Sequence, residues 1–338
     1  MTQARKIGPE KIGIVLFNLG GPHNLEAVEP FLFNLFMDPD IFTFPLASLV
    51  RKPLARFISS RRASKSRVYF EYMGGKSPII DHTLDQARAL EKSLNHSQRI
   101  PNTQFKVVVA MRYWKPFASN AIRILKREGI EKIVLLPLYP QYSYTTTRSS
   151  LVDWKESCKK MGVSFEQEFF ISDYFDHPLY LKSVAGRIQE AIAKFDENER
   201  THIHLLFSAH GIPLKEIKAG DPYEQQIKQS VIGVMHELGD LYPHTLAYQS
   251  KVGPLKWLQP NTVDVIPQLA AKGVRNLIAI PISFVSDHSE TLYELKKMYG
   301  ELALQSGIRQ YELMPALNDS PLFIEALVDL VWRGMVKI

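Results

Sequence analysis

The chain has 338 residues, of which 45% are hydrophobic and 22% are charged, and its formal net charge at pH 7 is +6. This length and composition suit a globular protein of two lobes, each of about 150 residues. The single cysteine, Cys158, excludes an internal disulfide and a cysteine-ligated iron–sulfur cluster within one chain. The sequence has no zinc-ligand spacing and no basic stripe with interleaved aromatic residues, which argues against nucleic-acid binding.

The amino-terminal residues 1–11 lack the apolar core of a secretion signal. No later segment approaches the run of about 18 apolar residues that a membrane-spanning helix needs. A single cysteine in the whole chain is also typical of a reducing compartment. We therefore expect a cytoplasmic protein.

Apolar runs that end in turns containing glycine or proline recur along the chain, and helical patterns such as residues 121–129 and 263–273 separate them. Such runs are typical of buried parallel strands. Strands that alternate with helices indicate parallel sheets flanked by helices. The runs lie at residues 12–22, 104–116, 129–137, 203–213, 244–254 and 273–281.

The second half of the chain repeats the pattern of the first. Residues 129–137 and 273–281 align without a gap, from a glycine to a proline, and the polar loops that follow them reach Thr147 and Thr291. We therefore predict an α/β fold of two similar Rossmann-like lobes, each a parallel sheet flanked by helices, with a cleft between them. The expected boundaries are residues 1–170 and 171–320, followed by a carboxyl-terminal helix at 321–338 that packs across a lobe.

Open α/β sheets bind ligands outside the carboxyl ends of their strands. Histidine and acidic residues cluster at these ends only in the second half of the chain. His210 ends the apolar run LLFSA, and Gly211 and Pro213 follow it, so its imidazole is expected at the mouth of the cleft. The alternative is a hydrogen-bonded histidine with a purely structural role.

The second cluster is SDHSETLYE, at residues 286–294. Asp287 suits the N-cap of the following helix, and Glu290 matches the spacing of a capping box. Alternatively, Asp287, Glu290 and Glu294 line one helical face, where three carboxylates require solvent, protons or a cation. Histidine and carboxylate together suit a divalent metal such as Fe(II), Zn or Mn. The matching positions of the first half carry Ser143, Thr146 and Ser150.

Motifs in both halves resemble those of the ferrochelatase family, and they occur in order over nearly the whole chain. In the second half they are FSAHGIP at 207–213, GDPY at 220–223, YQSKVGP at 248–254 followed by Trp257, and SDHSETLYE at 286–294. In the first half they are NLGGP at 18–22, GGKSP at 74–78, MRY at 111–113 and LYPQ at 138–141. Each motif is short, and their combination carries the resemblance.

The resemblance implies insertion of Fe²⁺ into protoporphyrin IX with release of two protons, the final step of heme biosynthesis. Ferrous iron and the porphyrin would be substrates, with no tightly bound cofactor and no iron–sulfur cluster. His210 and Glu290 are implied to be catalytic and to face the metal. A neutral imidazole near pH 7 suits both a proton acceptor and an iron ligand, and the sequence leaves this choice open.

The resemblance implies roles for three further residues near Glu290. His288 would support Glu290 by hydrogen bonding, with a structural histidine as the alternative. Glu294 and Asp287 would form a relay that carries protons or iron outward.

The resemblance also implies a set of porphyrin-binding residues. Arg112 and Tyr113 match cleft residues of the family, and Arg112 would hold a propionate through paired hydrogen bonds. A structural salt bridge is the alternative for Arg112. Ser77 is a second propionate candidate. Trp257 would pack beside the macrocycle, unless it belongs to the core.

Residues 41–67 match the lip of the family's porphyrin cleft. They combine an apolar stripe with several basic residues, and Arg61 or Arg62 would contact propionates. Most such stripes pack on a core. A basic apolar lip would also suit peripheral contact with an anionic membrane, so we expect a monomer or weak dimer located in the cytoplasm or at the periphery of the inner membrane. The stripe consists of Leu46, Leu49, Val50, Leu54, Phe57 and Ile58.

Several alternatives remain open. Enzymes that act on coproporphyrin III tend to carry a tyrosine where this chain has Leu19, which favours protoporphyrin. A non-catalytic tetrapyrrole or metal carrier of the same fold would need no base beside the metal. A cobalt chelatase usually lacks the SDHxET and QSKVGP motifs, and a dinucleotide enzyme would need GxGxxG after the first strand.

Overall fold

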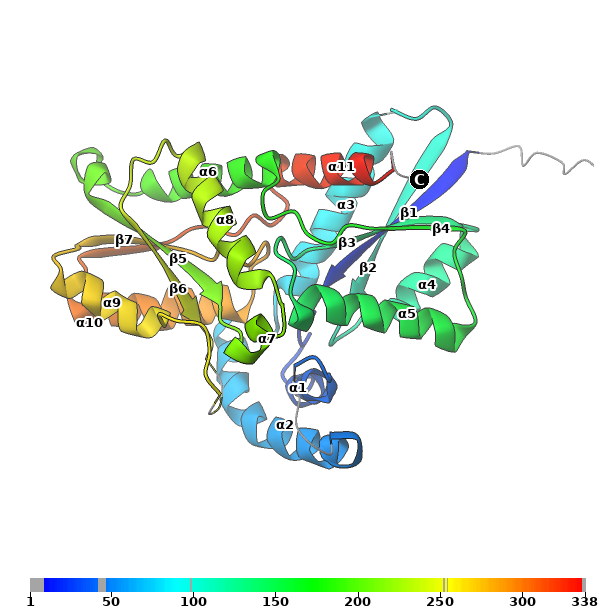
Figure 1. Ribbon diagram of the computed structural model, residues 1–338, viewed down its shortest axis with the longest axis horizontal. Coiled ribbons are helices and arrows are strands. Elements are labelled where there is room, and N and C mark those ends of the chain that lie inside the picture. Colours follow the sequence, from blue (N-terminus) through cyan, green and yellow to red (C-terminus); the bar gives the residue numbers. More distant parts are fainter. Residues whose placement is uncertain (1–8, 42–46, 98, 252, 254, 336–338) are drawn as a thin grey trace, which may run out of the picture.

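The computed structural model describes residues 9–41, 47–97, 99–251, 253 and 255–335, without the side chains of 47–49 (Figure 1). The described residues form two sheets, each with four parallel strands. The first sheet has the order β2-β1-β3-β4, and the second has the order β6-β5-β7-β8. The shared strand order confirms the prediction of two similar Rossmann-like lobes.

Six of the eight strands in the described residues overlap the predicted apolar runs, whereas no run predicts the two edge strands at residues 167–170 and 310–313. In the first sheet they are β1 (Glu10–Asn18), β2 (Thr103–Met111), β3 (Lys132–Pro137) and β4 (Gln167–Phe170). In the second sheet they are β5 (Ile203–His210), β6 (His244–Gln249), β7 (Asn276–Ile280) and β8 (Gln310–Leu313). The central strands β1 and β5 are buried on both faces, which explains their nearly continuous apolar sequences.

Helices cover both faces of each sheet (Figure 1). One layer runs across both lobes and contains α3 (Ile79–Ser97), α6 (Pro178–Ile192), α8 (Tyr223–Glu237) and α11 (Pro321–Met335). The opposite face of the first sheet packs against α4 (Ala118–Arg127) and α5 (Ser149–Met161). The opposite face of the second packs against α9 (Thr262–Ala271) and α10 (Gly300–Ser306).

The layer shared by the two lobes forms one continuous hydrophobic core. Leu16 of β1 and Phe207 of β5 belong to the same buried cluster, together with side chains of the four helices of that layer. Polar contacts also join the lobes, since Gln141 Nε2 donates to Ser230 Oγ over 3.0 Å and the backbone N–H of Tyr142 donates to Gln226 Oε1 over 2.6 Å. The helix α11 packs on α3, on α6 and on the strands β3 and β4.

Two helices project beyond the sheets. The helix α1 (Val28–Met37) packs against α2 (Ala47–Tyr72), and α2 hangs below both lobes in Figure 1. The face of α2 toward α1 includes Ala55, Ala63 and Phe70.

The residues of the expected apolar stripe differ in their exposure to solvent in the structure. Val50 and Phe57 are 43% and 57% exposed, so they do not pack on a core. Ile58 instead packs against the α1–α2 cluster. Leu46 and the side chain of Leu49 lie outside the described residues. None of the helices in the described part of the chain is long and apolar enough to cross a bilayer.

Four short helices complete the chain. They are the π-helix η1 (Tyr144–Arg148), the 3₁₀-helix η2 (Glu197–His202), the α-helix α7 (Leu214–Lys218) and the π-helix η3 (Glu290–Tyr299). The two π-helices follow β3 and β7, at matching positions of the two lobes, and π-helices often mark functional sites. The repeat seen in the sequence therefore extends to an uncommon backbone conformation.

Candidate active site

His210 and Glu290 meet at the carboxyl edge of the second sheet. His210 is the last residue of β5, and Glu290 is the first residue of η3, which follows β7. His210 Nδ1 donates to Glu290 Oε2 over 2.8 Å. This contact fixes the orientation of the imidazole and leaves Nε2 for a substrate, as carboxylates that orient metal- or proton-binding histidines do.

The pair is recessed but reachable, since its side chains are 35% and 24% exposed. Burial by itself lowers the pKa of His210, but the charge of Glu290 and the hydrogen bond to it raise that pKa above its ordinary value. Burial by itself raises the pKa of Glu290, and His210 more than offsets this effect, so the carboxyl is held below its ordinary pKa. The arrangement makes His210 a stronger base than a free histidine.

Neighbouring residues hold the imidazole in place. The backbone N–H of His210 donates to Ser283 Oγ over 3.0 Å, and Tyr223 Oη donates to the His210 carbonyl over 2.9 Å. The rings of Trp257 and Phe284 lie edge-on to the imidazole, with centroids 6.4 and 6.3 Å away. Aromatic walls on two sides suit a flat apolar ligand.

Ser250 links Glu290 to Glu294, and the sequence interpretation did not single it out. Ser250 Oγ lies 2.9 Å from Glu290 Oε2 and 2.7 Å from Glu294 Oε2, and its backbone N–H donates to Glu294 Oε1 over 3.2 Å. A hydroxyl carries one hydrogen, so both short contacts form together only when one carboxyl group is protonated. Burial and the charge of Glu290 raise the pKa of Glu294 above its ordinary value, so Glu294 is the more readily protonated of the two carboxyl groups. The signal available in the sequence was the position of Ser250, directly after the strand end at Gln249.

Asp287 lies apart from the two glutamates. Its carboxylate accepts hydrogen bonds from Thr291 Oγ1 over 2.9 Å and from Asn318 Nδ2 over 3.0 Å. The expected capping box is wrong, because the helix begins at Glu290 with π winding and Glu290 contacts His210 instead. The expectation of three carboxylates on one helical face is also wrong.

His288 is buried and does not hydrogen-bond to Glu290. Its Nδ1 donates to the Ser286 carbonyl over 3.1 Å, and its ring lies against Phe284 at a centroid distance of 4.4 Å. Its buried Nε2 has no hydrogen-bond partner among the described residues. Burial lowers the pKa of His288, so this histidine is neutral at pH 7.

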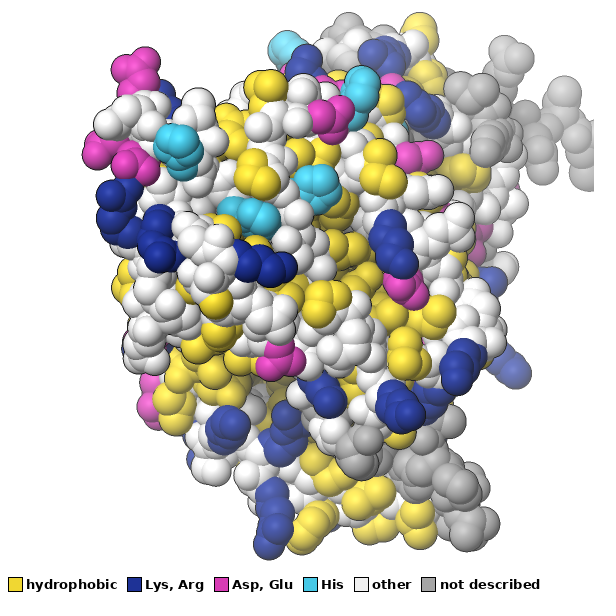
Figure 2. All heavy atoms as spheres, turned by 60° about the vertical axis from the view of Figure 1, so that its left-hand side comes forward, with side chains coloured by type: hydrophobic (Ala, Val, Ile, Leu, Met, Phe, Trp, Pro, Cys, Tyr) yellow, Lys and Arg dark blue, Asp and Glu magenta, His cyan; other side chains and the backbone are white. Residues whose placement is uncertain are grey.

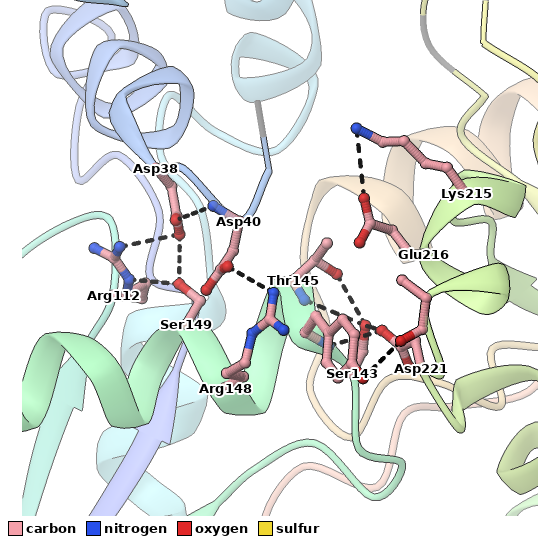
Figure 3. Close-up of polar contacts among 12 residues, drawn as sticks. Asp38, Asp40, Arg112, Ser143, Thr145, Arg148, Ser149, Lys215, Glu216 and Asp221 are labelled. Carbon is pink, nitrogen blue, oxygen red and sulfur yellow. Dashed lines mark hydrogen bonds and ion pairs between the residues drawn. The ribbon is translucent and has the colours of Figure 1, made fainter. Parts of the chain in front are cut away.

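Arg112 and Tyr113 are bound into a buried polar network centred on Asp38 (Figure 3). Arg112 Nη2 lies 3.0 Å from Asp38 Oδ2, and Arg112 Nε donates to Ser149 Oγ over 2.7 Å. Tyr113 Oη donates to Asp38 Oδ2 over 2.7 Å, and burial together with the charge of Asp38 raises its pKa well above the ordinary value. The structural salt bridge is therefore the arrangement that Arg112 adopts, and Tyr113 is fully buried.

The other residues expected to bind porphyrin lie at several places. Ser77 is buried, and its backbone N–H donates to the Pro22 carbonyl over 2.8 Å. Leu19 is partly buried at the carboxyl end of β1. Trp257 pairs with Pro213 in an isolated bridge and faces His210. Arg61 lies over the Phe57 ring at 4.9 Å, and Arg62 lies over the Phe36 ring at 5.7 Å, so both guanidinium groups contact the α1–α2 unit.

A groove of about 520 Å³ opens between the lobes. On one wall Arg148 Nη2 lies 2.7 Å from Asp40 Oδ1, and on the other Lys215 Nζ lies 3.5 Å from Glu216 Oε1 (Figure 3). On the face shown in Figure 2, hydrophobic side chains gather between the histidines in the upper part and the Lys and Arg side chains in the lower part, over α2. The groove is lined by Pro39, Asp40, Tyr144, Arg148, Lys215, Glu216 and Ala219.

The site combines an imidazole, two carboxyl groups and a hydroxyl that are joined by hydrogen bonds. Among the described residues no hydrogen bond occupies His210 Nε2, and Glu290, Ser250 and Glu294 form a hydrogen-bonded chain on the Nδ1 side of the ring. Within the described residues, no group of three or more His, Cys, Asp and Glu side chains is placed to hold a metal ion.

The fold is similar to those of two solved chelatase-like structures. SirB from Bacillus subtilis aligns with a TM-score of 0.56 at 8% sequence identity, over 96% of this chain and 95% of that one. The protein DR2241 from Deinococcus radiodurans aligns with a TM-score of 0.52 at 10% identity, over 97% of this chain and 56% of that one. At these identities the similarity establishes the fold.

Sequence comparison identifies the family. The family model described as Ferrochelatase matches residues 11–335. The Ferrochelatase of Aquifex aeolicus is 49% identical over 321 residues, which cover 95% of this chain and 98% of that protein. The Ferrochelatase of Geotalea daltonii is 45% identical over 95% of this chain and 97% of that protein. The chain, in which the histidine that ends β5 contacts the first glutamate of η3 in the second of two Rossmann-like lobes, belongs to the ferrochelatase family.

Proposed function

We propose that this protein is a lyase that inserts Fe²⁺ into protoporphyrin IX and releases two protons, as the final step of heme biosynthesis. The observation that carries the proposal is the contact of 2.8 Å between His210 Nδ1 and Glu290 Oε2 at a reachable strand end. Metal insertion requires a base for two pyrrole N–H groups and a surface that brings the metal to the ring centre. Both requirements are met by this pair.

His210 acts as the proton acceptor in this proposal. The hydrogen bond to Glu290 directs the Nε2 lone pair away from the carboxylate, and the raised pKa of His210 strengthens its affinity for a pyrrole proton. Each proton that His210 accepts must leave before the next arrives. The contacts of Ser250 with Glu290 and Glu294 support a relay in which the proton passes from His210 through these carboxyl groups.

Iron enters as a substrate, facing His210 and Glu290. A carboxylate and an imidazole are ligands that Fe(II) accepts in proteins, and the four pyrrole nitrogens supply the remaining positions once the protons have left. Trp257 and Phe284, whose rings lie edge-on to His210, would contact the macrocycle. A site that fits a distorted ring better than a flat one would expose the nitrogen lone pairs to the metal.

Substitution of the two central residues tests the proposal. We expect His210→Ala and Glu290→Gln to bind protoporphyrin as the wild type does. The rate of Fe²⁺ or Zn²⁺ insertion should fall at least about 100-fold in both, since removal of a general base typically costs this much. Porphyrin fluorescence measures both binding and metallation. Asp81→Asn, which removes an exposed carboxylate paired with Lys76, is the matched control.

Wild-type protein that binds porphyrin without forming metalloporphyrin would instead identify a carrier. Unchanged rates in both variants would contradict the assignment of the site. Protoporphyrin IX is proposed over coproporphyrin III because Leu19 offers no hydroxyl at the end of β1. Faster metallation of coproporphyrin III than of protoporphyrin IX would reverse that choice.

We also propose that α2 contacts the membrane surface of an otherwise cytoplasmic protein that is a monomer or weak dimer. Phe57 and Val50 are exposed on α2, and Arg56, Arg61 and Arg62 are exposed on the same helix. Apolar and basic groups together favour an anionic bilayer surface. Flotation with anionic liposomes should recover the protein at low salt and not at high salt. Absence of salt-sensitive binding would refute the contact.

Sedimentation tests the oligomeric state, and a stable assembly larger than a dimer would contradict the proposal.

A further inference from the structure

An aromatic cluster joins the projecting helix α2 to the helix that carries the two glutamates. The rings of Tyr69 and Tyr293 stack at a centroid distance of 4.4 Å and an interplanar angle of 28°. Tyr72 meets the same Tyr293 ring edge-on at 5.5 Å. Lys297 Nζ lies 5.3 Å from the centre of the Tyr72 ring, so side chains of α2 and η3 alternate through the cluster.

Tyr293 sits between the two glutamates in η3. Further along, η3 is anchored in its own lobe, since Leu295 is fully buried and Tyr311 Oη donates to the Leu295 carbonyl over 2.7 Å. Tyr293 is therefore a residue through which α2, from the other half of the chain, contacts η3. It lies next to Glu294 and three residues after Glu290.

The π winding of η3 determines where Tyr293 points. A π-helix has more residues in each turn than an α-helix and turns through a smaller angle per residue. Three residues after Glu290, a side chain consequently points further from the Glu290 side than it would with α winding. The stack on Tyr69 favours this direction, so it favours the winding in which Glu290 reaches His210 and Glu294 reaches Ser250.

The helix α2 connects α1 to η3. It hangs outside both sheets and packs mainly on α1, while its carboxyl-terminal end reaches η3 through Tyr69 and Tyr72 (Figure 1). A displacement of α2 therefore acts on the turn of η3 that presents Glu290 and Glu294.

We propose that Tyr69 and Tyr293 are positioning residues, which hold η3 in its π winding and couple the position of α2 to that of Glu290. The inference rests on the proposed metal insertion for its kinetic consequence only. Its structural part, the control of η3 by a residue of α2, stands independently of the reaction.

Amide hydrogen exchange of the full-length protein tests the structural part. Tyr69→Ala should speed exchange in residues 290–294 about two- to tenfold, the effect expected from the loss of one aromatic pair. Tyr69→Phe keeps the ring and should exchange as the wild type does. Val68→Ala is the matched control, because Val68 is the exposed neighbour of Tyr69 on α2. Unchanged exchange at 290–294 in Tyr69→Ala would overturn the proposal.

Kinetics test the coupling to catalysis. Tyr69→Ala and Tyr293→Ala should each lower kcat for Zn²⁺ insertion about two- to tenfold with little change in the KM for porphyrin, and Tyr69→Phe should retain the wild-type kcat. The double variant should be no slower than the slower single variant, because both substitutions remove the contact between Tyr69 and Tyr293. If the two losses in kcat multiply in the double variant, or if only the KM for porphyrin rises, the coupling is rejected.

The two proposals can fail separately. Wild-type protein without metallation activity would reject the proposed function, and the exchange measurement would still decide whether Tyr69 controls η3. An active wild type with unaltered variants would reject the positioning role and leave the proposed function intact.

Discussion

The contact between His210 and Glu290 changes the acid–base properties of both side chains. Burial alone would favour the neutral imidazole, and the adjacent carboxylate reverses this preference. A histidine that accepts protons must be neutral when the substrate arrives. The rate of metal insertion should therefore fall as the pH drops through the raised pKa of His210, because the imidazole is then already protonated.

The pKa of His210 should fall when Glu290 loses its charge. In Glu290→Gln the imidazolium no longer faces a carboxylate, while the opposing effect of burial remains, so protonation becomes less favourable. Titration of the His210 ring protons by NMR, in wild type and variant, measures the shift directly. Asp81→Asn should leave the titration unchanged. An equal or higher pKa in Glu290→Gln would show that the two side chains do not interact in solution.

The sequence identified some members of the site and missed others for clear physical reasons. His210 was placed at the cleft because an apolar run must end where its strand leaves the core. Asp38 was missed because its partner Arg112 lies far along the chain, and no local spacing indicates such a contact. Ser250 was missed because its role depends on a left-handed backbone, with φ of 65°, which turns its N–H and hydroxyl toward Glu294.

Among the helices and strands, the strands were the more predictable elements. Buried parallel strands require continuous apolar runs, so their positions follow from the sequence alone. The winding of η1 and η3 was not predictable, because residues spaced by four lie on a similar side of an α-helix and of a π-helix. The expected capping box at Asp287 and Glu290 failed because the helix begins at Glu290 itself, which contacts His210 instead.

The carboxyl-terminal helix α11 packs closely on the edge of the first sheet. A Cβ atom at Gly334 would lie 2.6 Å from Phe169 Cδ1 of β4, whereas a Cβ at Gly186 of α6 would meet no atom within 4 Å. The two helical glycines thus differ in the space around them.

Alanine at these two positions should have opposite effects on stability. Gly334→Ala should lower the free energy of unfolding by about 1–3 kcal/mol through overpacking. Gly186→Ala should raise it by about 0.5–1 kcal/mol, because alanine favours the helix. Urea denaturation of both variants measures the difference. A stabilised Gly334→Ala would mean that α11 is not packed against Phe169 in solution.

Considered as a whole, the molecule has two sheets and a core that both share. Large proteins commonly unfold one domain at a time. Here Leu16 and Phe207 belong to one buried cluster, and Gln141 and Gln226 hydrogen-bond across the lobes. Separating the lobes would expose that cluster and break those bonds.

We therefore expect the two lobes to unfold in a single transition. Hydrogen exchange measured at increasing urea concentrations should give the same midpoint for peptides from β1 and β5. Peptides from α2 should lose protection at lower urea, because α1 and α2 form a separate cluster outside the shared core. Distinct midpoints for β1 and β5 would show that the lobes are independent units.

The matching strand order gives residues at the strand ends of the second half a counterpart in the first half. Leu16 pairs with Leu136 in the first sheet as Phe207 pairs with Ile280 in the second, and with this register Leu19 is the twin of His210 and Thr146 the twin of Glu290. One copy of the repeated backbone thus carries ionisable groups where the other carries an alkyl chain and a hydroxyl. Two copies of one backbone therefore differ in acid–base character at matching positions, so the asymmetry of the molecule lies in its side chains and not in the course of these strands.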